Sequence, residues 1–194
     1  MHQPNSKAQD QRDADVALLG RVRHGDRGAF SDLYRRYHPR LYGYLRRLLS
    51  DPGTVEEVLD DVMLVVWKDA RKFRGNAAVS TWIFGIAYRK ALTAVRADCR
   101  YQAPLDRRAD LSAISSQSGE RDEWIGAALM RLSPDHRQVV ELTYFSGFSY
   151  QEIAEIAGCP VNTVKTRMFH ARRRLKVLLP KLAGRDKEKD RERA

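Results

Sequence analysis

The sequence has few cysteines and no long apolar run, and each absence excludes a class of protein. Its two cysteines, Cys99 and Cys159, form no CxxC pair and lie near no pair of histidines. We therefore expect neither a disulfide framework nor a structural zinc site, and a reducing cytoplasm fits this composition. No apolar run approaches the roughly 20 residues of a spanning helix. The first residues also lack the apolar core of a signal peptide, so we expect no membrane insertion.

Enzyme motifs and strand patterns are missing as well. The sequence contains no GxxxxGK[ST], GxSxG or HExxH motif, no repeat of fixed period and no run that alternates as a strand does. A missing motif does not exclude an enzyme, but nothing indicates catalytic residues, a cofactor, a bound metal or a small-molecule substrate. We predict an all-α fold without chemistry of its own.

Basic residues are in excess, and this excess indicates the kind of partner. The 194 residues carry a formal net charge of +10, which favours an acidic partner such as nucleic acid or, as the weaker option, an anionic membrane surface. This length corresponds to one large domain or two small ones.

A helix-turn-helix pattern occupies residues 149–176. Ser149 followed three residues later by Glu152 is a capping box, which predicts that a helix begins there. Gly158 suits a tight reversal of the chain, and Pro160 suits the first turn of a second helix. A turn between two short helices is the motif with which many proteins enter the major groove of DNA.

The second of these helices has an apolar side and a basic side. The apolar stripe comprises Val164, Met168, Ala171, Leu175 and Leu178. The candidate DNA-binding residues on the opposite side and its flanks are Asn162, Thr163, Lys165, Thr166, Arg167, His170, Arg172, Arg173 and Arg174. No acid occurs from Val161 to Leu179, whereas a merely solvated face usually mixes both signs. We predict that Asn162, Thr163 and Thr166, followed by His170, meet base edges and that the arginines bind phosphate.

Amphipathic helices are also expected over residues 13–23, after Asp26, and after Thr54. Asp26 can cap the second of these, which Pro39 should kink or split. Thr54 with Glu57 forms another capping box.

The helix after Thr54 exposes an acidic face, defined by Glu57, Asp60 and Asp61. Three explanations stay open for this face: a solvated surface, a docking surface for a basic partner, or a divalent cation site.

A basic loop follows, at residues 71–76, and precedes a helix for which Ser80 is the expected cap. Its candidate nucleic-acid residues, with two from the next helix, are Arg71, Lys72, Arg74, Asn76, Trp82 and Arg89. Cations beside aromatic rings suit unpaired bases, because the cations follow the backbone and the rings accept bases. The alternative is that Trp82 and its aromatic neighbours are core, and for Trp82 the two explanations are equally supported.

The resulting domain organisation has five parts. We predict a disordered segment at 1–12, a helical domain at 13–100, a linker at 101–120, a helix-turn-helix domain at 121–179, which is winged-helix-like, and a charged tail at 180–194. Ser133 and Pro134 predict a helix start inside the second domain.

Two blocks of the sequence resemble one family, the extracytoplasmic-function sigma factors of bacterial RNA polymerase. The fourth conserved region of that family is similar to LSPDHRQVVELTYFSGFSYQEIAEIAGCPVNTVKTRMFHARRRL. The second region is similar to DLYRRYHPRLYGYLRRLL, EEVLDDVMLVVWKDARKF and VSTWIFGIAYRKAL, in that order. Asp60, Arg89, Thr93 and Asn162 stand where the family often has Gln, Asn, Asp and Gly.

The resemblance implies a function and a set of partners. Residues 30–100 would bind the clamp helices of the polymerase β′ subunit, through Glu57, Asp60 and Asp61, and open the minus-ten promoter element. The loop from Lys72 to Ser80 would capture a flipped base there. Residues 122–179 would bind the minus-thirty-five element, and an anti-sigma factor would inhibit the protein, holding it in the cytoplasm or near the membrane.

Two other classes remain as alternatives. A free-standing DNA-binding regulator would use the same C-terminal helix, but it would need a dimer for paired half-sites. A nucleic-acid enzyme would use Glu57, Asp60 and Asp61 with a metal ion and would lose its activity on chelation.

Overall fold

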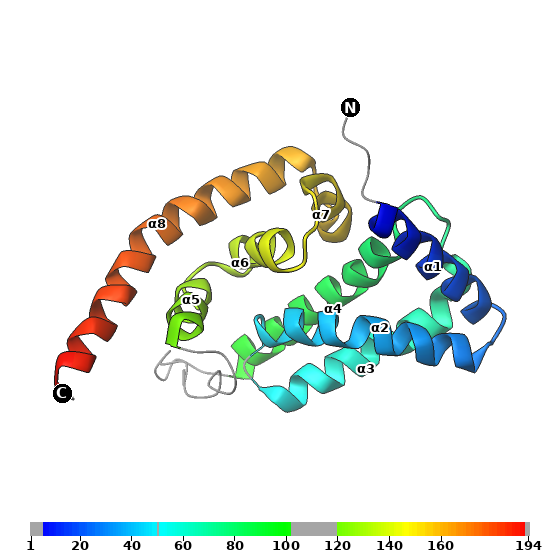
Figure 1. Cartoon of the computed structure of the whole chain (residues 1–194), viewed down its shortest axis with the longest axis horizontal. Coiled ribbons are helices and arrows are strands. Elements are labelled where there is room, and N and C mark those ends of the chain that lie inside the picture. The colour runs from blue at the N-terminus through cyan, green and yellow to red at the C-terminus, as the bar shows by residue number, and fades with distance from the viewer. Residues whose placement is uncertain (1–5, 50, 102–119, 193–194) are drawn as a thin grey trace. The chain divides into compact units, whose positions relative to one another are not determined.

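The computed structural model describes residues 6–49, 51–101 and 120–192 (Figure 1). These residues form helices joined by short turns, with no strand among them, so the predicted all-α class is confirmed. The chain divides into two compact units, the first made mainly of residues up to Ala97 and the second mainly of those that follow. Within the described ranges, no helix is both long and apolar enough to span a lipid bilayer.

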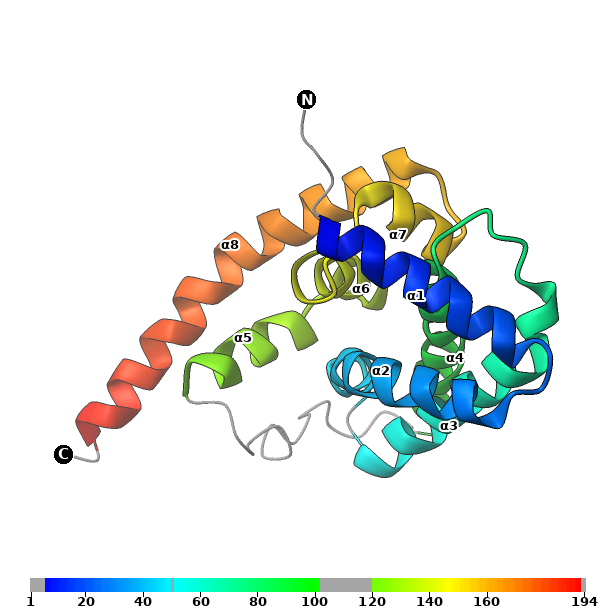
Figure 2. The same ribbon diagram turned by 45° about the vertical axis from the view of Figure 1, so that its right-hand side comes forward.

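The first unit contains four helices and a short 3-10 turn. They are α1 (Ser6–Val22), α2 (Arg27–Arg46), α3 (Pro52–Asp69), the 3-10 turn Ala70–Lys72 and α4 (Val79–Tyr101). Both α1 and α3 pack along α2, as Figures 1 and 2 show from two directions. The rings of Tyr44 on α2 and Phe84 on α4 are fully buried, with centroids 5.4 Å apart, and they tie α4 to the same core.

A buried carboxylate fastens α1 to α2. Asp15 on α1 is only 4% exposed, and it accepts hydrogen bonds from the Tyr37 hydroxyl and, at 2.7 Å, from the Arg36 guanidinium. Burial, and then this hydrogen bond, raise the pKa of Tyr37. The cluster supplies partners for three polar groups that apolar surroundings would otherwise penalise.

Several local expectations for the first unit need correction. Helix α1 begins at Ser6, earlier than the expected start near Asp13, because the segment is rich in helix formers and gains a Gln9–Asp13 side-chain bond of 3.0 Å. Helix α2 continues through Pro39 instead of splitting.

Two expected caps in this unit are also wrong, while a third is confirmed. Asp51, not Thr54, caps α3, because its carboxylate accepts from the Thr54 backbone N–H at 2.6 Å and Pro52 occupies the first turn. Helix α4 begins at Val79, so Ser80 lies inside it. Asp26 does cap α2.

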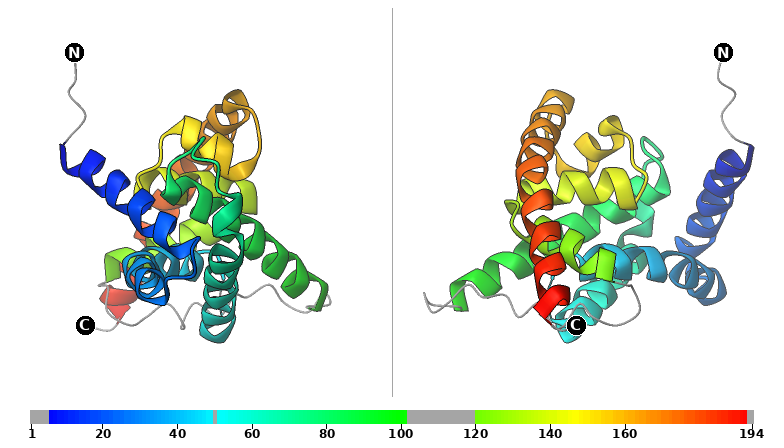
Figure 3. Two further views of the ribbon diagram at one scale, coloured as in Figure 1. Left: turned by 90° about the vertical axis from the view of Figure 1, so that its right-hand side faces the viewer. Right: turned by 60° about the vertical axis from the view of Figure 1, so that its left-hand side comes forward.

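The second unit contains α5 (Glu120–Met130), α6 (Pro134–Val140), a π-helical turn (Glu141–Phe145), most of α7 (Tyr150–Ala157) and α8 (Val161–Glu192). Both α5 and α6 pack along α8, an arrangement visible in the right-hand view of Figure 3. Ser133 caps α6 with Pro134 in its first turn, as predicted. In the apolar stripe of α8, Val164, Met168, Ala171 and Leu178 are buried, whereas Leu175 is half-buried.

The last helix is longer than the sequence suggested. Helix α8 continues through Pro180 to Glu192, so most of the predicted charged tail is helical. Its abundance of Lys, Glu and Arg explains this, because all three have high helix propensity. The predicted linker at 101–120 lies, apart from its two end residues, outside the described residues.

Candidate nucleic-acid interfaces

The turn between α7 and α8 has the geometry that its sequence predicts. The Glu152 carboxylate accepts from the Ser149 backbone N–H at 2.9 Å, and the Ser149 hydroxyl accepts in turn from the Glu152 N–H at 3.3 Å. Gly158 has φ +63°, a conformation that residues with a Cβ rarely adopt, and this reverses the chain into α8. The capping box and the glycine turn together fix how α8 leaves the domain.

The first turns of α8 present the residues predicted to meet base edges. Asn162, Thr166 and His170 are exposed, and Thr163 is half-buried. The Thr166 hydroxyl donates to the Asn162 carbonyl at 2.9 Å, so its methyl group and oxygen lone pairs remain available. An asparagine amide can pair with adenine, and a threonine methyl can contact the methyl group of thymine.

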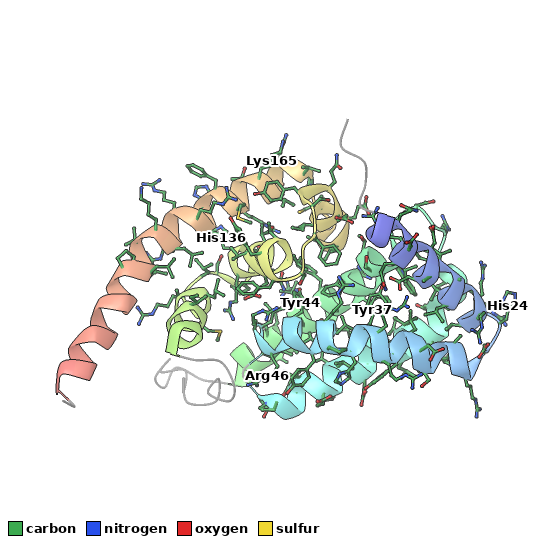
Figure 4. The ribbon with its side chains drawn as sticks, viewed as in Figure 1. His24, Tyr37, Tyr44, Arg46, His136 and Lys165 are labelled. Atoms are coloured by element: carbon green, nitrogen blue, oxygen red, sulfur yellow. The ribbon has the colours of Figure 1, made fainter. Side chains whose placement is uncertain are left out.

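Most of the predicted phosphate-binding cations of α8 face solvent. Lys165 projects from the outer side of the helix (Figure 4), and Arg173 and Arg174 are also exposed. Among the side chains that the structure describes, Arg173 and Arg174 form no ion pair. Unpaired guanidinium groups on one helix face are available to the acidic backbone of a nucleic acid.

Arg167 differs from the other predicted cations of α8. Its guanidinium lies 2.8 Å from the Asp135 carboxylate on α6, and its side chain is only 24% exposed. The pair joins α6 to α8, so Arg167 holds the helix in position and is not free for phosphate in this structure.

Arg172 is held by an aromatic residue that the sequence pattern did not identify. Tyr144 comes from the π-helical turn and is 58% exposed. Its hydroxyl accepts from the Arg172 Nη2 at 2.7 Å, and the guanidinium carbon lies 5.8 Å from the ring centroid. This hydrogen bond raises the pKa of Arg172 further above its already high ordinary value. Because π-helical turns alter which side chains face outward, the helical spacing of this segment could not identify Tyr144.

The basic loop of the first unit combines anchored and free groups. Arg71 donates to the Arg23 carbonyl at 3.1 Å, and Lys72 pairs with Asp69 at 2.8 Å. Arg74 and Asn76 flank Gly75, which has φ +75°, and both are exposed. The tip of the loop therefore presents the Arg74 guanidinium, which forms no ion pair with the side chains that the structure describes, and the Asn76 amide.

Trp82 and Arg89 share one face of α4. They are seven residues apart, which is two helical turns, and Arg89 is exposed. Trp82 is half-buried, with its ring centroid 5.4 Å from that of Phe73. The ring thus belongs partly to the packing of the loop and partly to the surface, which is consistent with both explanations left open by the sequence.

The acidic face of α3 does not converge on one point. Asp60 accepts from the Tyr34 hydroxyl on α2 at 3.3 Å, and Asp61 pairs with Lys90 on α4 at 2.7 Å. Glu57, one helical turn before Asp60 and Asp61, is exposed. Within the described part of the chain, no three histidine, cysteine or acidic residues come together as a metal site. The three carboxylates instead form a broad negative surface.

Comparisons with known proteins identify both units. The family model described as Sigma-70 region 2 matches residues 33–100, and the one described as Sigma-70, region 4 matches residues 122–175. The chain is 31% identical over 169 residues to the ECF RNA polymerase sigma factor SigK of Mycobacterium tuberculosis, with 82% of this chain and 90% of that protein covered. It is also 31% identical over 172 residues to the ECF RNA polymerase sigma factor RpoE of Cereibacter sphaeroides, with 83% and 92% covered.

Two solved structures are similar over most of their length. One is CnrH in complex with the cytosolic domain of CnrY, with a TM-score of 0.69, 26% identity and 86% of this chain and 97% of that one covered. The other is the sigma factor RpoE in complex with the anti-sigma factor NepR from Bartonella quintana, with a TM-score of 0.64, 26% identity and 78% and 96% covered.

Proposed function

The chain belongs to the extracytoplasmic-function group of sigma-70 RNA polymerase sigma factors, and from this premise we propose how its two units divide the work of promoter recognition. Sigma factors of this group serve promoter-specific initiation of transcription by RNA polymerase. The first unit binds core polymerase and opens the minus-ten element, and the second unit binds the minus-thirty-five element as duplex DNA.

The exposed side of α8 from Val161 to Leu179, a stretch without acids, is the observation that carries this proposal. Asn162 and Thr166 are exposed at the start of the helix, and Arg173 and Arg174 continue the same side without an ion pair among the described side chains. A helix that begins with hydrogen-bonding side chains and continues with free cations suits a major groove bordered by phosphates.

In the first unit, the tip of the basic loop and helix α4 bind the minus-ten element once it is single-stranded. Arg74 and Asn76 follow the backbone of the separated strand, and Trp82 offers a ring beside it. Extruding a base costs a few kcal/mol of stacking, which contacts of this kind can offset.

The acidic face of α3 docks on the clamp helices of the polymerase β′ subunit. Asp60 is held by a contact with α2 and Asp61 by a contact with α4, so the carboxylates do not converge on one point. A negative surface of this kind suits a basic protein surface better than it suits a single cation. An anti-sigma factor is a further partner, as in the complex of the Bartonella relative.

Run-off transcription with core polymerase tests the proposal. A genomic library is transcribed with and without the protein, and the start sites are mapped by sequencing. We expect a new set of starts that share two elements upstream, and none of these starts without the protein. Initiation at the same sites in both reactions would refute the proposal. Protection of a duplex operator without polymerase would instead indicate a free-standing regulator.

A further inference from the structure

A basic pocket lies beside α8, at the edge of the helix-turn-helix. It has a volume of about 430 Å³ and opens between α8 and the corner where α5 passes into α6. Its lining contains five residues that carry or can carry positive charge: Arg131, His136, His170, Arg173 and Arg174. No acid lines it.

The three arginines of this basic pocket are available to a ligand. Each is exposed, and among the described side chains none forms an ion pair. The neighbouring acid, Asp135, is already engaged by Arg167 at 2.8 Å. Three guanidinium groups around one concave site favour an oxyanion, because planar N–H donors match the oxygens of phosphate.

The two histidines add hydrogen-bond donors to the lining of the basic pocket. Their ring centroids are 6.0 Å apart, and His136, labelled in Figure 4, lies between α6 and α8. Burial, and then the nearby His170, lower the pKa of His136. A neutral imidazole in this position can still donate one hydrogen bond to an anion.

The distance along α8 from the residues predicted to contact bases to the basic pocket is close to the width of a DNA groove. His170, Arg173 and Arg174 follow Asn162 and Thr166 on the same side of the helix. At a rise of about 1.5 Å per residue, Arg173 lies about 10 Å beyond Thr166 and about 16 Å beyond Asn162. The major groove is about 12 Å wide, so a helix with Asn162 and Thr166 at base edges brings Arg173 to the bordering strand.

We propose that this basic pocket binds a phosphate group of the DNA strand that borders the groove occupied by α8. Arg131 and His136, which lie outside the helix-turn-helix, thereby become DNA-contacting residues and set the register of α8 on the duplex. The inference rests on the proposed function of the second unit.

Replacing single DNA phosphates tests the inference on the complete holoenzyme. Neutral methylphosphonates are introduced one at a time around the minus-thirty-five element, and promoter affinity is measured for the wild type, Arg131→Gln and Lys176→Gln. Lys176 is the matched control, since it is an exposed cation of α8 outside the pocket.

One position should respond in a distinctive way. There the neutral phosphate should weaken wild-type binding about tenfold, which is the scale of one charged hydrogen bond. The same replacement should have little further effect on Arg131→Gln but its full effect on Lys176→Gln. Arg131→Gln should also reduce the slope of log affinity against log salt by about 0.9. His136→Gln should reduce the response at the same position.

The opposite results have distinct meanings. Equal losses for Arg131→Gln and the wild type at every position would overturn the inference while leaving the proposed function intact. Absence of promoter-dependent binding by the wild-type holoenzyme would instead overturn the proposed function. Titration with inorganic phosphate, followed through the His136 ring resonances, separates the two sources of phosphate. A response to free phosphate without any response to methylphosphonates would show a small-anion site and overturn DNA as the ligand.

Discussion

The two units carry their candidate binding residues, for DNA in both units and for polymerase in the first, in different ways. In the second unit these residues all come from α8 and most are exposed, although Arg167 pairs with Asp135 and Arg172 is bound by Tyr144. In the first unit they come from α3, a loop and α4, and several are tied to protein partners, as Arg71 is to Arg23 and Asp61 is to Lys90. A site on a single helix follows from periodicity, whereas a site built from several elements depends on tertiary contacts.

The largest expected effect concerns the distributed site of the first unit. Asp60→Ala combined with Asp61→Ala should weaken binding to core polymerase about a hundredfold, since truncating charged interface partners costs about 2–5 kcal/mol. Stability should change by less than about 1 kcal/mol, because the Asp61–Lys90 pair is exposed. Gel filtration and titration with labelled core enzyme measure the two quantities.

The matched control for this change is Asp32→Ala. Asp32 also forms an exposed ion pair, with Arg35, but it lies on α2 away from the acidic face. Its removal should leave core binding unchanged. An equal loss in both variants would indicate a general charge effect, and the acidic face would lose its proposed role.

The next largest effect distinguishes the arginines of α8 without an ion pair among the described side chains from Arg167, which pairs with Asp135. Arg173→Ala with Arg174→Ala should weaken promoter binding about thirtyfold and reduce the salt slope by about 1.8, or about 0.9 for each phosphate contact. Arg167→Ala should leave the slope unchanged and instead destabilise the second unit by about 1 kcal/mol, through loss of its partly exposed pair with Asp135. Filter binding of holoenzyme at several salt concentrations and urea unfolding test these expectations. A similar fall of the slope in Arg167→Ala would mean that the Asp135 pair opens on DNA.

A smaller effect concerns the packing of the first unit and depends on pH. The raised pKa of Tyr37 means that the neutral phenol stabilises the folded unit fully below the unfolded-state value of about 10. This contribution is lost progressively as the pH rises from the unfolded-state value towards the higher folded-state pKa, so wild-type stability should fall by about 1 kcal/mol from pH 10 to 11. Tyr37→Phe should lack this part of the fall. Urea midpoints at pH 8, 10 and 11 measure it, and an equal dependence on pH in the two proteins would refute the raised pKa of Tyr37.

The smallest effect distinguishes base contacts from phosphate contacts. Thr166→Ala should change the preferred base at one position of the minus-thirty-five element by about fivefold, on the scale of one modest base contact. Overall affinity for nonspecific DNA should stay within about twofold, because phosphate contacts supply most of it. Binding selection from a randomised element measures both. A uniform loss without any change of preference would place Thr166 on the backbone instead.

Local patterns predicted much of the second unit correctly. The Ser149–Glu152 capping box, the Ser133 cap and the turn at Gly158 all appear in the structure. Each depends on residues within a few positions of one another, so the neighbouring sequence is sufficient to specify it. The apolar stripe of α8 was predictable for the same reason, since the helix repeat is constant.

Where competing local signals occurred, the sequence prediction was less accurate. Thr54 and Asp51 could both cap α3, and Asp51 does so because Pro52 then fits the first turn. Pro39 was expected to kink or split α2. The helix is not split, and buried Leu33, Tyr37 and Leu41 pack it on either side of Pro39. Packing of this kind outweighs a local helix-breaking tendency.

The sequence by itself determined that this protein is all helical, where its helix-turn-helix lies and which side of α8 is basic, because these properties depend on spacing along one element. The tertiary structure alone decided which charges are engaged. Arg167 turns to Asp135, Arg172 to Tyr144, and Arg131 comes beside Arg173 to form one basic pocket. A side chain's partner on another helix depends on how the helices pack, and periodicity along a single helix carries no information about that packing.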